Sequence, residues 1–412
     1  MLFLLMLKKL FFATLSLIII YILISQNYIY QFFVSNTGDG YFADWNYFIK
    51  ALECEKIKSE CGIFNYGKIF LLFPYEKDYE FFYSNLVPMI LIIFFILVVF
   101  NIIEQKNNKD LILTFILLFN PSTLLLIERA NTDILFFLII FIICYSRIYI
   151  LNFALIGFSF LAKYYPITFF VNFFLENKFR KTTVSLTLFL LCLILCLSYV
   201  FLNFSEFKNF LENSGYSKSG YHYLFSVKTI PKVIKYIFDI NYIFLLVIFY
   251  SLFIFISVKI YKHLKSKEFF DKLDLYRKED RLFIVGTNTL LLCFLLFSNW
   301  YYREVFLIFS IPLILLMKNK YNNNFISWLY NLLILRYIFL FLYSYLLLQE
   351  THYHLNGERI FHNFFLIFVF LKGFIDFVMM AFLSGFLINY NLIILNQLKI
   401  SLSDLIKIKP KN

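Results

Sequence analysis

The sequence has few charged residues for its length. Charged residues make up 16% of the 412 residues, whereas about a quarter is usual in soluble domains. Glycine and proline are scarce, and neither a low-complexity linker nor a separate soluble domain can be recognised. Hydrophobic residues make up 61% of the chain and mean hydropathy is +0.75. A soluble fold is therefore excluded, and lipid is the solvent that this composition requires.

Metal-ligand spacing and internal symmetry are also missing. The five histidines never join cysteines at the distances of a zinc site. Three of them, His352, His354 and His362, flank one turn without a carboxylate at ligand spacing. The inverted repeats of many secondary transporters are not evident. We therefore predict no metal, no other cofactor and one polytopic unit over residues 1–412.

Long apolar runs predict an all-α integral membrane protein with about 12 (10–13) transmembrane helices. The first run is too long for a signal-peptide core and lacks a small-residue cleavage site, so we interpret it as a spanning helix. The predicted spans are roughly 10–34, 84–103, 111–128, 133–147, 148–163, 164–176, 184–203, 240–260, 281–298, 304–317, 325–349 and 363–391.

The net charge of +12 predicts topology rather than a nucleic-acid partner. Most basic residues lie in short segments between apolar runs, including the loop 261–281 and the end of the chain. If successive helices cross the membrane in opposite directions, these segments all lie on one side. By the positive-inside rule, that side is the cytoplasmic one. We expect a multi-pass protein of the cytoplasmic membrane with both termini in the cytoplasm, in contact with membrane lipids.

Two longer loops, 35–84 and 204–239, then face the outside and are expected to carry short interfacial helices. Cys54 and Cys61 share the first loop, where they form a disulfide in an oxidising compartment or remain two free thiols. His222 lies in the second loop and suits sugar hydroxyls or a lipid phosphate, although a lone histidine is more often structural.

Two carboxylates, Asp39 and Asp44, follow the first apolar run among aromatic residues. A carboxylate at a membrane surface can act as a general base, and the aromatic side chains can stack on a sugar. The alternative interpretation of Asp44 is an ordinary cap of the amphipathic stretch that follows it.

Polar residues cluster again after the third apolar run. Asn120-Pro121 ends that run, and Glu128, Arg129, Asn131 and Asp133 follow within one short turn. Such a group is costly at a membrane interface unless its charges are paired, and it commonly marks a site. A structural ion pair that closes a helical hairpin is the alternative, and Asp133 also suits a helix cap.

Lys163 and Arg303 are the remaining basic candidates on the outer side. Lys163 precedes Tyr165 and Pro166, where the proline interrupts an apolar run. Tyr302 and Arg303 occupy a short turn, where an arginine can contact a phosphate in bidentate fashion. Simple snorkelling of the lysine and an interfacial pair of Arg303 with its neighbouring glutamate are the alternatives.

Three ionisable residues lie inside apolar runs. Arg336 is in the eleventh predicted helix, and Lys372 and Asp376 are four residues apart in the twelfth. Intramembrane charges are functional candidates by default. Mutual neutralisation of Lys372 and Asp376 on one helix face is the simpler interpretation.

The order of these segments resembles the C-type superfamily of polytopic membrane glycosyltransferases, and within it glycosyltransferase family 87, which uses polyprenyl-phosphate mannose. Ala130 stands where the family has glycine, and the chain after residue 320 shows no matching motif. The matching segments are Asp44 to Ala51, Asn120-Pro121, Glu128 to Asp133, Lys163 to Pro166 and Tyr302-Arg303.

The resemblance implies a C-type fold and inverting transfer of a mannose-like sugar. The donor would be a polyprenyl-phosphate sugar, and the acceptor a lipid-linked sugar or glycan on the outer membrane face. Asp44, or Asp39 in its place, would deprotonate the acceptor hydroxyl. The donor phosphate would be held by Arg129, Lys163 and Arg303. The further substrate-binding candidates are Glu128, Asn131, Asp133, Tyr165, Tyr302 and His222.

Two other functions remain open. A flippase or transporter for lipid-linked oligosaccharides would use Arg336, Lys372 and Asp376 as a path through the membrane. An oligosaccharide polymerase or ligase is also polytopic, but its large loop usually comes late, whereas the long loops here come early.

Overall fold

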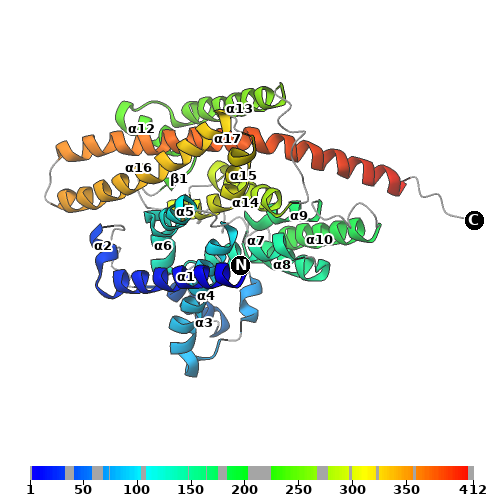
Figure 1. Ribbon diagram of the computed structural model, residues 1–412, viewed down its shortest axis with the longest axis horizontal. Helices are drawn as coiled ribbons and strands as arrows, with labels where there is room; N and C mark the ends of the chain where they lie inside the picture. Colours follow the sequence, from blue (N-terminus) through cyan, green and yellow to red (C-terminus); the bar gives the residue numbers. More distant parts are fainter. Residues whose placement is uncertain are drawn as a thin grey trace, which may run out of the picture.

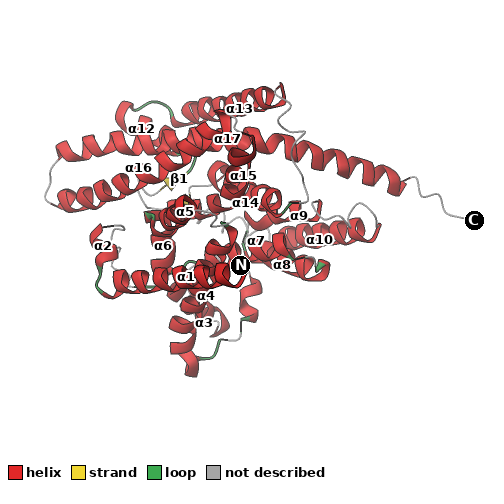
Figure 2. Ribbon diagram, viewed as in Figure 1, coloured by secondary structure: helices red, strands yellow, loops and turns green. Residues whose placement is uncertain are grey.

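The computed structural model describes residues 2–32, 41–57, 68–73, 75–103, 108–146, 148–163, 165–174, 183–202, 224–266, 277–296, 299–321, 324–355 and 359–406. Within these ranges the regular structure is helical apart from one pair of two-residue strands, β1 (Leu224–Phe225) and β2 (Asn299–Trp300), which are antiparallel, and short loops join the elements (Figure 2). The predicted all-α class is therefore confirmed.

The first half of the chain contains α-helices and several short 3-10 or π-helical segments. Its elements are α1 (Leu2–Ser25), α2 (Tyr28–Phe32), α3 (Ala43–Ile57), η1 (Lys68–Leu72), η2 (Lys77–Tyr79), η3 (Phe82–Leu86), α4 (Val87–Ile102), α5 (Asn108–Phe119), α6 (Pro121–Arg129), α7 (Asp133–Tyr145), α8 (Tyr149–Ala162), η4 (Tyr165–Phe170), α9 (Val171–Phe174) and α10 (Thr183–Leu202).

The second half contains the longest helices. Its elements are β1, α12 (Thr229–Phe238), α13 (Tyr242–Ser266), α14 (Lys278–Leu296), β2, η7 (Tyr301–Ser310), α15 (Ile311–Tyr321), α16 (Asn324–Leu355) and α17 (Arg359–Ile406). Helix α17 runs alongside α13 and α16, and its C-terminal end projects beyond the other helices (Figure 1). Helix α14 contacts α7, η4 and η7, and so joins the two halves of the chain.

Several helices are apolar and long enough to cross a membrane, so the protein is a multi-pass membrane protein. Among the described residues there are five such helices, or six if the bent pair α5–α6 forms one span. The expected count of about 12 is thus not confirmed. The five are Met6–Ser25, Phe82–Ile102, Tyr242–Ser266, Asn324–Gln349 and Phe364–Asn396.

Several predicted spans differ from the observed elements. The run 10–34 ends as a helix at Ser25, because the chain turns at Asn27, whose φ is 56°. The run 304–317 divides into the 3-10 helix η7 and the short helix α15, and the run 164–176 divides into η4 and α9. Neither part of either divided run is long enough to cross a bilayer, which needs ~20 residues in a helix.

The break between α5 and α6 follows from two residues. Pro121 is the first residue of α6 and has no N–H to donate, so the two helices meet at 51°. The Asn120 side chain accepts from the backbone N–H groups of Ser122 and Thr123 at 2.9 and 3.1 Å. It also donates to the carbonyl of Leu117 at 2.6 Å. The cap therefore fixes the direction in which α6 leaves α5.

Each of the two long loops contains a described helix. Helix α3 lies within 35–84 and packs against α6, and α12 lies within 204–239 and packs against α17. Gly373 allows α12 to approach α17 closely, because an added Cβ at this position would come within 3.1 Å of Ile230. The loop 261–281 is helical at both described ends, since α13 extends to Ser266 and α14 begins at Lys278.

Candidate functional site

Residues from three distant parts of the sequence meet around Asp44, which lies in the first turn of α3. Arg129, at the end of α6, donates from Nε to Asp44 Oδ1 at 2.7 Å, and its Nη2 lies 2.7 Å from the same oxygen. The Asn131 amide donates to Asp44 Oδ2 at 2.5 Å and contacts the Tyr302 hydroxyl at 2.9 Å. Both carboxylate oxygens of Asp44 are therefore held by side chains of the α6–α7 turn.

Asp133 is the second centre of the site. Lys163 Nζ lies 2.5 Å from Asp133 Oδ1, and the Tyr165 hydroxyl donates to the same oxygen at 2.7 Å. Arg303 Nε donates to Asp133 Oδ2 at 3.0 Å, and its guanidinium lies 5.4 Å from the centre of the Tyr165 ring. The two centres together form what we call the polar network, namely Asp44, Arg129, Asn131, Asp133, Lys163, Tyr165, Tyr302 and Arg303.

The turn between α6 and α7 places the network's two centres side by side. Ala130 ends α6 in the left-handed conformation, with φ 44° and ψ 46°, and its N–H bonds back to Ile127. The Asn131 side chain then accepts from the N–H of Asp133 at 2.9 Å, which caps α7. One asparagine thus caps a helix with its oxygen and holds Asp44 with its nitrogen.

The left-handed conformation of Ala130 makes a specific stability prediction. A residue with a Cβ loses about 1–2 kcal/mol in this conformation, whereas glycine does not. We expect Ala130→Gly to raise the free energy of unfolding in detergent by about 1 kcal/mol. Ala154→Gly, on the exposed face of α8, is the control and should lower it by about 1 kcal/mol. An equal decrease in the free energy of unfolding in both variants would contradict the assignment of strain to Ala130.

The 3-10 helix η7 distributes three consecutive side chains to different partners. A 3-10 helix has about 3 residues per turn, so successive side chains point about 120° apart. Tyr302 contacts Asn131, Arg303 contacts Asp133, and Glu304 faces a separate cluster on α16 and α17. Helix α14 packs closely against η7 at Gly286, where an added Cβ would overlap the Phe309 side chain.

Burial divides the polar network into a dry base and an accessible edge. The side chains of Asp133 and Lys163 are 0% and 6% exposed, and Tyr165 is fully buried. Asp44 and Arg129 keep 16% and 10% of their side-chain surface. Arg303 keeps 15%. The charged members that keep accessible surface, which we call the accessible edge, are therefore one carboxylate and two guanidinium groups.

Glu128 is connected to the site through residues that the sequence did not single out. The Tyr30 hydroxyl donates to Glu128 Oε1 at 2.6 Å, and the Tyr30 and Tyr41 rings stack at 5.4 Å. Burial and this hydrogen bond raise the pKa of Tyr30, so the phenol stays protonated. The Phe42 N–H donates to the Glu128 carbonyl at 2.7 Å, with Phe42 at φ 57°. A strained backbone thus precedes Asp44, and no pattern in the sequence indicates it.

The intramembrane charges form a second, separate group, the four-charge cluster of Glu304, Arg336, Lys372 and Asp376. Arg336 lies between Glu304 and Asp376, with 2.8 Å from its Nε to Asp376. Lys372 is 3.1 Å from Glu304 and 2.8 Å from Asp376. All four are buried and their charges cancel. The predicted Lys372–Asp376 pair is present, and Arg336 and Glu304 join it. Glu304 therefore pairs with these residues, whereas one of the two interpretations of the sequence paired it with Arg303.

Some candidates cannot be placed. Asp39, Cys61 and His222 lie outside the described residues. Cys54 is disulfide-bonded, whereas Cys144 and Cys293 are buried free thiols. In the part of the chain that the structure describes, no group of three or more His, Cys, Asp or Glu side chains has the geometry of a metal site.

The comparisons with known proteins add no relative. No protein-family model, no curated protein and no solved structure matches this chain. The function therefore has to be inferred from the site itself.

Proposed function

We propose that the protein is an inverting membrane glycosyltransferase that moves a sugar from a polyprenyl-phosphate donor to a hydroxyl acceptor. The observation that carries the proposal is the accessible edge of the polar network. One carboxylate there suits deprotonation of a hydroxyl, and two guanidinium groups suit a phosphate leaving group. The proposal also draws on the resemblance of the sequence motifs to glycosyltransferase family 87.

Asp44 is the proposed base. The acceptor hydroxyl gives its proton to the carboxylate as its oxygen attacks the anomeric carbon of the sugar. The bond from that carbon to the phosphate oxygen breaks, and the electron pair leaves with the polyprenyl phosphate. Asp44 then releases the proton to solvent, which its partial exposure permits. Attack from the face opposite the phosphate inverts the anomeric configuration.

Arg129 and Arg303 are the proposed phosphate contacts. Charge accumulates on the phosphate as the bond breaks, and guanidinium groups fixed in advance stabilise that charge without reorganisation. Asp44 fixes Arg129, and Asp133 fixes Arg303. Lys163 is more deeply buried, and we assign it the role of balancing the charge of Asp133.

The direct test is sugar transfer in membranes that contain the protein. Membranes with wild-type protein and matched membranes without it receive radiolabelled polyprenyl-phosphate mannose. We expect labelled lipid or glycan only where the protein is present. A panel of polyprenyl-phosphate sugars extends the test beyond mannose, and absence of transfer from every donor would contradict the proposed reaction.

A further inference from the structure

Helix α12 carries an unusual combination of charged and apolar residues. Lys228, Lys232 and Lys235 recur at spacings of four and three, so they share one side of the helix. The opposite side, with Ile230 and Val233, is buried. This is the pattern of a basic amphipathic helix, which lies in a membrane interface.

The position of α12 in the chain places it at a membrane boundary. Asp239 ends α12 in the left-handed conformation, with φ 52°, and α13 begins three residues later at Tyr242. Because α13 is one of the helices that can cross a membrane, its first residues mark the edge of the apolar layer. Tyr236, Phe238 and Ile243 are exposed around this turn, where a lipid boundary would cover them.

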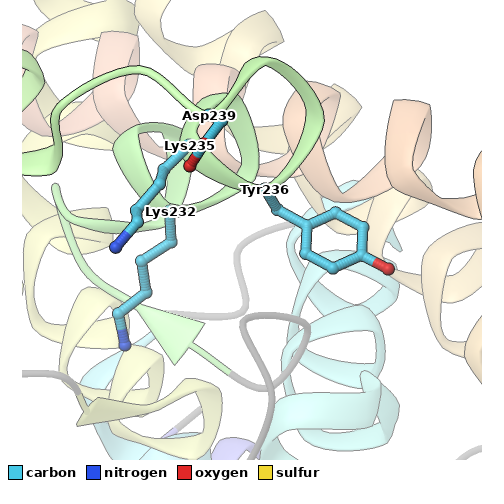
Figure 3. Close-up of a pocket in the computed structure, with 4 residues that line it drawn as sticks. All are labelled: Lys232, Lys235, Tyr236 and Asp239. Carbon is cyan, nitrogen blue, oxygen red and sulfur yellow. The ribbon is translucent and has the colours of Figure 1, made fainter.

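A pocket of about 460 Å³ lies against this turn, lined by Lys232, Lys235, Tyr236 and Asp239. The two lysine side chains extend from the helix in the same direction, Tyr236 extends to the other side, and Asp239 lies beside Lys235 (Figure 3). The N–H of Asp239 donates to the Lys235 carbonyl at 2.8 Å, which fixes the turn.

The charged side chains of this pocket form no ion pairs with the described residues of the protein. Lys228 donates to the Leu296 carbonyl at 3.1 Å, but no ion pair among the described residues engages Lys232, Lys235 or Asp239. Partial burial lowers the pKa of Lys232 from its ordinary value, and the nearby Lys228 adds to this shift. A partly dehydrated ammonium group gains more from an anionic partner than a fully hydrated one does.

We infer that this pocket binds the head group of a phospholipid that carries both a phosphate and an amine, as phosphatidylethanolamine does. Lys232 and Lys235 bind the phosphate, and Tyr236 lies at the level of the head group. Asp239 would repel a purely anionic ligand, whereas it pairs with the ammonium group of a zwitterionic one. None of these residues belongs to the polar network, so the inference does not depend on the proposed function.

Lipid binding by the full-length protein tests this inference. Purified protein in detergent is titrated with dioleoyl phosphatidylethanolamine or dioleoyl phosphatidylglycerol, and bound lipid is counted by native mass spectrometry. We expect tighter binding of phosphatidylethanolamine. Replacing both lysines, Lys232→Gln with Lys235→Gln, should weaken binding of both lipids roughly 30-fold. Asp239→Asn should remove the preference between them.

The control is the double variant Lys262→Gln with Lys265→Gln. It replaces two exposed lysines near the C-terminal end of α13, which are three residues apart, as Lys232 and Lys235 are. This variant should bind lipid as the wild type does. Unchanged binding by the Lys232 and Lys235 variant, or equal weakening in the control, would overturn the site. Equal affinity for the two lipids would overturn the role of Asp239. Displacement of the lipid by inorganic phosphate at similar concentration would show that free phosphate is the ligand instead.

Discussion

Asp44→Asn is expected to reduce sugar transfer by about 10³-fold while leaving the protein folded, because general-base catalysis contributes about 10² to 10⁴ in rate. Asparagine has nearly the same shape as aspartate and keeps an oxygen that accepts from Arg129, which donates to Asp44 at 2.7 Å. It cannot take up the acceptor's proton. Initial transfer rates in membranes with equal amounts of each protein provide the measurement.

The matched control for Asp44→Asn is Glu55→Gln, which neutralises an exposed carboxylate on the same helix. It should retain wild-type activity. Full activity of Asp44→Asn would show that Asp44 is not the base, and Asp39 would then be the next carboxylate to replace. A loss that accompanies unfolding of the variant would assign Asp44 to structure, in line with the alternative interpretation of this residue.

Lys372→Met is expected to lower the free energy of unfolding by about 3–5 kcal/mol, because it leaves buried charge without a partner. Lys372 lies 2.8 Å from Asp376 and 3.1 Å from Glu304 in the four-charge cluster. Without it, two carboxylates face the single guanidinium of Arg336. Unfolding of the purified protein in mixed micelles measures the effect.

Two further variants distinguish the effect of an unbalanced charge on stability from the effect of losing a lysine side chain. Lys372→Met combined with Asp376→Asn leaves Glu304 and Arg336 as a neutral pair, so more than half of the lost stability should return. Lys399→Met removes an exposed lysine from the same helix and should have little effect. If Lys372→Met were as stable as the wild type, the cluster would not hold the helices together, and a role in transport would become the better interpretation.

Much of the polar network could be predicted from the sequence, because a polar residue within an apolar run costs free energy unless it finds a partner. Asn120-Pro121, the residues from Glu128 to Asp133, and Lys163 each interrupt an apolar run, and polar groups there need partners. The structure brings these residues together with Asp44 and Arg303. Linear order alone cannot show that Asn131 would join the two centres, because that contact depends on the left-handed turn at Ala130.

The number of spans was less predictable, because hydropathy does not distinguish lipid from a protein interior. In α17, 56% of the apolar window is buried inside the protein, whereas in α1 the share is 17%. Both helices have similar hydropathy but different surroundings. For the same reason η7 resembles a spanning helix in the sequence, although its apolar residues from Val305 to Phe309 are buried against other helices. The pocket at α12 depends on how the chain turns at Asp239, which no motif indicates.

The most direct test of the proposed reaction is the fate of the donor's phosphate bond. Purified protein in lipid vesicles receives a donor with one label on the sugar and another on the polyprenyl phosphate, together with an acceptor glycolipid. We predict one molecule of free polyprenyl phosphate for each sugar transferred, and almost none of either product with Asp44→Asn. Movement of the intact, doubly labelled donor across the membrane, without cleavage, would contradict a glycosyltransferase and would identify a transporter.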